Sequence, residues 1–225
     1  MANLLSGLSE TVKWRLLVEA AKRAAEAQGY SLTRVPGRGL SNIWNITKDG
    51  KTTTASIRTT RDRYIAFPPL EGGTKWKTLD DVETVIVATV DSKDDPENIE
   101  VYIFPAEDVR RRFNAHYAAR SKEGQMIKDN FGMWVGLDRD NRGLAASVGT
   151  GILDHYKSVA IYSIPELLAA HPQEEADSEE PEHSPEAVAP GLSTIAEVMA
   201  WARDRVAQLA GVRTEAVKLD LKIEY

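Results

Sequence analysis

The sequence predicts an α/β protein in which a mixed central sheet contains a β-hairpin and is flanked by helices. Apolar residues recur at helical spacing over 9–28, an Asp-Gly pair separates two strand-like runs within 41–63, and residues 82–90 are almost continuously apolar. An Asp-Gly pair in this setting is a strong signal for a tight hairpin turn. The apolar run is typical of a strand at the centre of a sheet.

The hairpin has a register that follows from its turn. If Asp49 and Gly50 are the central turn residues, three cross-strand pairs are fixed. They are Lys48 with Lys51, Ile46 with Thr53, and Trp44 with Ala55. Side chains alternate along a strand and opposed residues share a face, so the two faces of the hairpin differ in character.

One predicted face is apolar and the other is polar and basic. The apolar face holds Trp44, Ile46, Ala55 and Ile57. The polar face holds Ser41, Asn45, Thr47, Thr52, Thr54, Ser56 and Arg58, with Ile43 as its apolar member. Hydroxyl, amide and guanidinium groups on one face are typical of a surface that contacts phosphate.

The remaining elements follow from local signals. Ser9 is a suitable cap for the helix over 9–28, and Gly29 is a suitable stop. We expect strands at 30–35, 64–67, 82–90, 99–104, 133–137 and 159–162, and further helices over 105–120 and from Pro165. Pro105 is expected at the first helical position, followed by acids in the first turn.

Three regions are expected along the chain: a core at 1–170, an acidic linker at 171–190 and a helix–strand element at 191–225. The linker is rich in Pro and acids and lacks aromatics, so it cannot bury enough surface to offset its ordering entropy. A capping box at Thr194 and Glu197 predicts a helix, and alternation over 217–225 predicts a strand. An element of this size is expected to dock on the core or to mediate self-association.

Charge is distributed unevenly along the chain. Residues 1–77 contain 13 Lys and Arg against 6 Asp and Glu, a net of +7, whereas the whole chain has a net charge of −6. A basic region within an acidic chain is typical of a protein that binds nucleic acid or another polyanion. The absence of cysteine, of a long apolar run and of a secretory signal leads us to expect a cytoplasmic protein with no membrane partner.

The helix, hairpin and strand order over about residues 9–120 resembles the core of the PD-(D/E)XK, or restriction-endonuclease-like, superfamily. In that family an acid on the first hairpin strand, and an acid and a lysine two residues apart on the next, bind Mg²⁺ and activate water. The matching positions here are Asn45, Ser56 and Arg58. Because neither carboxylate is present, the resemblance implies a nuclease-like fold without a metal site and without catalytic residues. The sequence also resembles bacterial accessory proteins.

The expected nucleic-acid contacts come from the hairpin, the adjacent loops and one helix stripe. They are Arg34, Arg38, Arg58, Arg61, Arg63, Lys75, Trp76, Lys77, Arg112, His116 and Arg120. Trp76 lies between two lysines in a Gly-rich loop, which predicts an exposed ring able to stack on a base. Trp14, Trp44, Trp134 and Trp201 are instead expected to anchor the core.

The preferred hypothesis is therefore an accessory or regulatory protein that binds nucleic acid, DNA as the first choice, without a cofactor and without cleavage. One alternative is a nuclease that uses Mg²⁺ bound by carboxylates elsewhere, such as Asp49, Asp62 or Glu71. A second alternative is an assembly adaptor that acts through residues 191–225.

Overall fold

The computed structural model describes residues 4–5, 7–35 and 43–170, together with Met199, Ala200, Arg203 and Lys218. The chain divides into two compact units, Met1–Pro181 and Glu182–Tyr225. The predicted linker at 171–190 lies outside the described residues, as does most of the predicted helix–strand element. Met199, Ala200 and Arg203 are helical, within the helix expected from residue 194.

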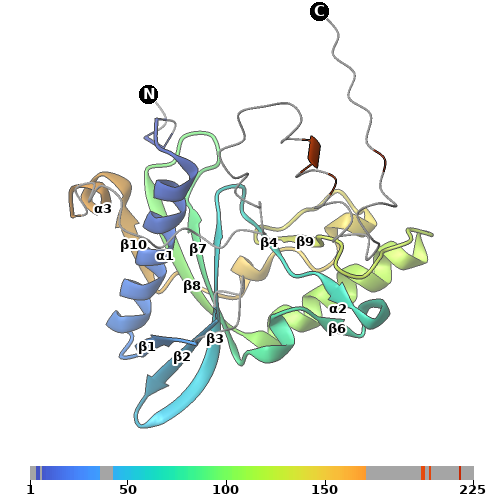
Figure 1. Ribbon diagram of the computed structural model, residues 1–225, viewed down its shortest axis with the longest axis horizontal. Helices are drawn as coiled ribbons and strands as arrows, with labels where there is room; N and C mark the ends of the chain where they lie inside the picture. Colours follow the sequence, from blue (N-terminus) through green and yellow to red (C-terminus); the bar gives the residue numbers. More distant parts are fainter. Residues whose placement is uncertain are drawn as a thin grey trace, which may run out of the picture. The chain divides into compact units, whose positions relative to one another are not determined.

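The first unit is built on a six-stranded sheet with the order β1-β2-β3-β7-β8-β10 (Figure 1). Its strands are β1 (Ser31–Arg34), β2 (Ile43–Lys48), β3 (Lys51–Thr60), β7 (Thr84–Val90), β8 (Asn98–Pro105) and β10 (Ala160–Ser163). The β3–β7 pair is parallel and the other pairs are antiparallel, so the predicted mixed sheet is confirmed. The apolar strand β7 lies at its centre, as its composition predicts.

The hairpin forms with the predicted register. Lys48 pairs with Lys51, Ile46 with Thr53 and Trp44 with Ala55. Asp49 has φ 53° and Gly50 has φ 76°, the positive values that a two-residue type I′ turn requires. The turn chemistry therefore fixes which side chains of β3 face each side of the sheet.

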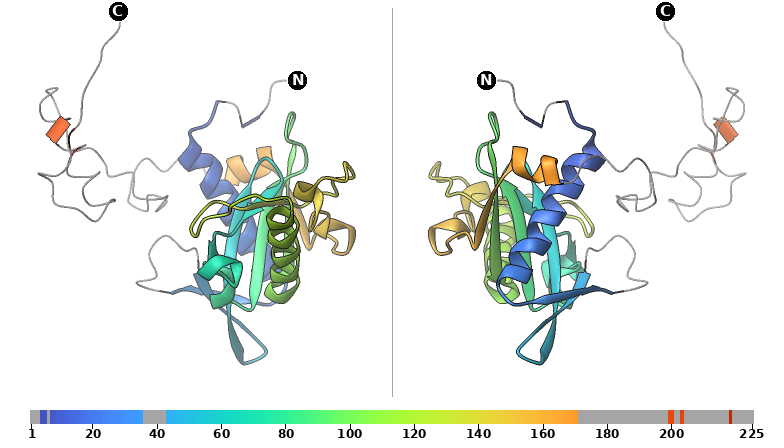
Figure 2. Two further views of the ribbon diagram at one scale, coloured as in Figure 1. Left: turned by 90° about the vertical axis from the view of Figure 1, so that its right-hand side faces the viewer. Right: turned by 90° about the vertical axis from the view of Figure 1, so that its left-hand side faces the viewer.

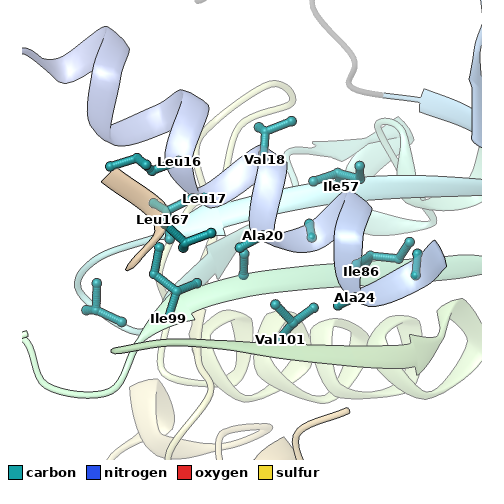
Figure 3. Packing of buried hydrophobic residues seen from close by; sticks show 14 of the residues in the cluster. Leu16, Leu17, Val18, Ala20, Ala24, Ile57, Ile86, Ile99, Val101 and Leu167 are labelled. Atoms are coloured by element: carbon teal, nitrogen blue, oxygen red, sulfur yellow. The ribbon is translucent and has the colours of Figure 1, made fainter. Parts of the chain in front are cut away.

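Helices α1 (Glu10–Ala27) and α3 (Ile164–Ala170) pack on one face of the sheet (Figure 2). Ser9 caps α1, its hydroxyl accepting the Val12 amide at 3.3 Å. Four fully buried alanines of α1, Ala20, Ala21, Ala24 and Ala25, allow close approach to the strands. Figure 3 shows the resulting core, in which α1 side chains contact Ile57, Ile86 and Val101. This face is almost entirely apolar.

The opposite face is covered by α2 (Ala106–Lys122) and by short strands. These strands are β4 (Tyr64–Ala66), β9 (Trp134–Gly136), β5 (Pro69–Leu70) and β6 (Lys75–Trp76). Short 3₁₀ turns are formed by Glu71–Gly73, Leu79–Asp81, Ala145–Ser147 and Ile152–Asp154. The chain between β3 and β7 contributes much of this α2 layer, whose core includes Phe67, Trp76, Phe104 and Phe113.

Two details differ from the sequence-based expectation. Pro105 ends β8 and is the N-cap of α2 rather than its first helical residue. The expected strand at 133–137 does form as β9, but it pairs with β4 in a separate two-stranded ribbon. Among the described residues, no helix has the length and apolar character needed to cross a bilayer.

Candidate nucleic-acid interface

The polar face of the hairpin points to the α2 side of the sheet, and the α2 layer covers its inner half. Near the turn, Thr47 and Thr52 remain on the surface, and their hydroxyls are 2.8 Å apart. Further along β3, Ser56 is fully buried beside Val85. The expectation of one continuous exposed polar face is therefore wrong, because the β3–β7 crossover folds over its inner half.

Arg58 is the cationic residue of this covered region. It pairs with Val87 of β7, and its guanidinium carbon lies 4.4 Å from the centroid of the Phe67 ring. Its Nε is buried without a hydrogen-bond partner, as is the Ser56 hydroxyl two residues before it. No carboxylate within the described part of the chain forms an ion pair with Arg58. Arg58 as a residue is only partly buried, and the burial of its charged group lowers its pKa from 12.5 to about 10.

An arginine in this setting is electrostatically incomplete. Transfer of a cation out of water is unfavourable unless an anion and hydrogen-bond acceptors replace the lost hydration. The Phe67 ring compensates in part, because a cation above an aromatic face contributes about 1–2 kcal/mol. The Nε of Arg58 and the hydroxyl of Ser56 lie on the same face of β3, two residues apart, and both can donate to an oxyanion such as phosphate.

Arg63 has the opposite environment. Its Nε donates to Asp138 Oδ2 at 2.7 Å, and its Nη1 donates to Glu100 at 3.1 Å and to the Val90 carbonyl at 2.5 Å. These carboxylates raise the pKa of Arg63 above its ordinary value. Arg63 thus joins the turn after β3 to β8 and to the loop after β9, and its donors are occupied.

Most other expected phosphate contacts also have intramolecular partners. Arg61 pairs with Glu10 at 2.5 Å, and Lys75 pairs with Glu71 at 2.7 Å. Arg112 donates to the carbonyls of Gly149 and Thr150, and Arg120 donates to Gln125. Lys77 is exposed, Arg34 lies on the exposed edge strand β1, and Arg38 lies outside the described residues.

Two of the expected contact residues are buried. The prediction that Trp76 is exposed is wrong: its side chain is 1% exposed, and its Nε1 donates to Asn114 on α2 at 2.7 Å. His116 is also buried, with its Nδ1 2.8 Å from the Val148 carbonyl and its Nε2 without a partner. Burial lowers the pKa of His116, and the nearby Arg120 adds to that effect. Neither ring is placed to contact nucleic acid.

Trp134 is a second tryptophan whose predicted environment is wrong. It was expected to anchor the core, yet its side chain is 52% exposed on the β4–β9 ribbon. Trp14 and Trp44 do pack against the α1 core, partly buried, whereas Trp201 lies outside the described residues. The alternation Met133-Trp134-Val135, with buried residues on either side, was the available signal for an outward Trp134.

The acids of the nuclease alternative are not gathered at one place. Asp49 lies in the hairpin turn and Asp62 follows the far end of β3, a ten-residue strand that spans about 30 Å. Asp62 accepts the Thr60 hydroxyl at 2.6 Å, and Glu71 is paired with Lys75. Within the described residues, no group of three His, Asp or Glu side chains is arranged to hold a metal ion.

Comparison with known proteins adds no assignment. The chain matches no family model, no curated protein and no solved structure.

Proposed function

We propose that this protein binds nucleic acid through its phosphate backbone, with Arg58 as the central contact and without cutting the strand. The observation that carries the proposal is the incomplete environment of Arg58, whose Nε is buried without a hydrogen-bond acceptor. The neighbouring arginines, Arg61 and Arg63, are already paired with carboxylates. A phosphate oxygen would supply both the charge and the acceptor that Arg58 lacks.

Ser56 supports the same ligand. Its hydroxyl is on the same face of β3 as Arg58 and also has no hydrogen-bond partner. Because Ser56 is fully buried, a phosphate can accept from this hydroxyl only if the layer that covers β3 moves aside. The excess of basic residues over 1–77 favours a polyanion over a small isolated phosphate, because it adds attraction at longer range. The resemblance to nuclease-like cores, at Asn45, Ser56 and Arg58, is consistent with a site that retains nucleic-acid binding.

The test is fluorescence anisotropy of dye-labelled DNA and RNA, single-stranded and duplex, titrated with the full-length protein over a salt series. We expect salt-dependent binding that weakens about tenfold in Arg58→Ala, since loss of a charge-assisted hydrogen bond costs about 1.5–3 kcal/mol. Arg111→Ala is a matched control, because Arg111 is exposed on α2 and paired with Asp108. The control should bind as the wild type does.

Two results would contradict the proposal. One is a wild-type protein that does not bind any of the four probes at low salt. The other is equal affinity in Arg58→Ala and the wild type. A gel of the same samples with Mg²⁺ tests the nuclease alternative, because cleavage lost in Asp62→Asn would support an enzyme instead.

A further inference from the structure

The β4–β9 ribbon presents a group of exposed aromatic rings on its outer side. Tyr64 pairs with Gly136 and Ala66 pairs with Trp134, whereas Ile65 and Val135 point inward and are buried. Tyr64 and Trp134 are therefore diagonal neighbours on one face, roughly 7–8 Å apart at their Cα atoms. Tyr64 is 43% exposed and Trp134 is 52% exposed. Phe131, just before the ribbon, is 48% exposed.

Phe131 and Trp134 form a corner of two rings in edge-to-face contact. Their ring centroids are 6.3 Å apart and their planes meet at 86°. The indole also lies against the backbone of Gly132, where a Cβ would approach its Cη2 to 2.2 Å. The ring therefore lies against a residue without a side chain, and Trp134 still has half of its surface in solvent. A ring that already packs against its neighbours has less entropy to lose when a planar group stacks on it.

The charged groups near this corner include one cation available to an anionic ligand and, among the described residues, one carboxylate, Asp129, that forms no ion pair. Asp138 is neutralised by Arg63 and Asp140 by Arg142, and Asp129 accepts the Glu71 and Gly72 amides at 2.9 Å. Lys128 has no ion pair within the described part of the chain. The Phe131 amide donates to the Lys128 carbonyl at 3.1 Å, which closes a turn and holds the two residues within about 7 Å.

We propose that this aromatic corner, Phe131 and Trp134, stacks an unpaired base of a single strand while Lys128 contacts the adjacent phosphate. The inference rests on the proposed nucleic-acid binding and narrows its ligand. Base faces are available in a single strand and are covered in a duplex, so exposed stacking rings discriminate between the two. Arg58 would contribute phosphate binding to either ligand, whereas Trp134 would contribute only to the single strand.

The experiment measures anisotropy of a dye-labelled oligothymidylate of about 12 nucleotides, a length within ordinary single-strand site sizes. A duplex of the same length is measured in parallel. Trp134→Ala should weaken single-strand binding about tenfold and leave duplex binding unchanged, since one stacked base contributes about 1–3 kcal/mol. Trp134→Phe should retain most of the affinity because it keeps an aromatic face.

Gly132→Ala offers an independent variant that leaves every aromatic residue in the chain. Its methyl group would displace the indole, so single-strand affinity should fall. Gly7→Ala is the control, because a Cβ there has no neighbour within 4 Å. Circular dichroism of each variant verifies that the fold is retained.

The outcomes separate this inference from the proposed function. Unchanged single-strand affinity in Trp134→Ala, with loss in Arg58→Ala, would overturn the stacking corner and leave phosphate binding intact. Equal losses on single strand and duplex in Trp134→Ala would also overturn it. A shift in sedimentation coefficient in Trp134→Ala, without a change in binding, would mark the corner as a protein interface. A wild type that binds neither probe would overturn both proposals.

Discussion

Arg58 and Arg63 lie five residues apart in the chain, near the C-terminal end of β3 and just beyond it, and their electrostatic environments differ. Arg63 donates to two carboxylates and two carbonyls, and its pKa is raised. Arg58 contacts an aromatic ring, has no carboxylate partner among the described residues, and its pKa is lowered. The difference indicates that one arginine stabilises the fold and that the other is available to a ligand.

Arg63→Ala tests the structural half of this comparison and should have the largest effect. Removing the guanidinium takes the cation away from Glu100 and Asp138 in a partly buried region, where Glu100 would still accept from the Tyr102 hydroxyl and the Val90 carbonyl from the Thr89 hydroxyl. We expect a loss of about 3 kcal/mol in the free energy of unfolding. Urea denaturation monitored by circular dichroism measures it. Arg111→Ala, at a surface ion pair, should change stability by less than about 1 kcal/mol. Similar values for both variants would contradict the assignment of Arg63 as a structural clamp.

Arg58→Met tests the other half and should change stability in the opposite direction. Methionine keeps an unbranched apolar stem over Phe67 and removes a desolvated, unpaired charge. We expect the protein without ligand to gain about 1–2 kcal/mol, since apolar replacement of poorly compensated buried ions is often stabilising. In the same variant, the magnitude of the slope of log affinity against log salt should fall by about one, which is the change expected when one phosphate contact is lost. A variant that is less stable than the wild type would show that Arg58 is already compensated.

His116 extends the comparison to a buried group that titrates near neutrality. Its folded pKa is lowered below the 6.5 of the free side chain, so the unfolded state binds the proton first as the pH falls. Stability should therefore be fully present above about pH 6.5 and should decrease below it, by about 1.4 kcal/mol for each unit by which the pKa is lowered. Thermal unfolding at pH 7.5 and 5.0 measures the decrease.

His116→Asn should reduce this pH dependence, because the amide can still donate to the Val148 carbonyl and does not titrate. His155→Asn is the control, since His155 is exposed on the surface. If His116→Asn and the wild type lose the same stability on acidification, His116 does not contribute to the pH dependence of stability.

Ser56→Ala should produce the smallest change in stability and a measurable change in binding. The hydroxyl is buried without a partner, so its removal should stabilise the unliganded protein by about 1 kcal/mol. If the layer over β3 opens and Ser56 donates to the same phosphate as Arg58, affinity should fall by about three- to tenfold. Thermal unfolding and anisotropy measured on the same sample compare the two effects. Unchanged affinity would limit the ligand contact to Arg58.

Local signals predicted the strands and the hairpin register because the Asp49-Gly50 turn and the alternation of side chains act within a few residues. The environment of the site could not be predicted in this way. Arg63 is paired with Glu100 and Asp138, which are 37 and 75 residues away, and no local pattern indicates those contacts. The covering of Ser56 likewise depends on the path of the chain between β3 and β7.

The two misplaced tryptophans differ in this respect. Trp76 lies between Lys75 and Lys77, which predicts an exposed ring. The two lysines are exposed, but the side chain of Trp76 points the other way and its Nε1 donates to Asn114 on α2. Trp134 is bulky and apolar, which predicts burial, but it occupies the outward position of the ribbon, where Gly132 gives it a support. For Trp76 the deciding contact comes from a residue 38 positions away, whereas for Trp134 the signal was local and lay in the alternation of the strand.

The parallel β3–β7 pair has a consequence for how fast the protein folds. The hairpin can form from contacts a few residues apart, whereas pairing of Ala55 with Thr84 must close a loop of about 29 residues. We expect the hairpin to be formed in the transition state and the crossover layer over Arg58 to consolidate after it. Substitutions in the turn would then slow refolding, and substitutions in the covering layer would mainly speed unfolding.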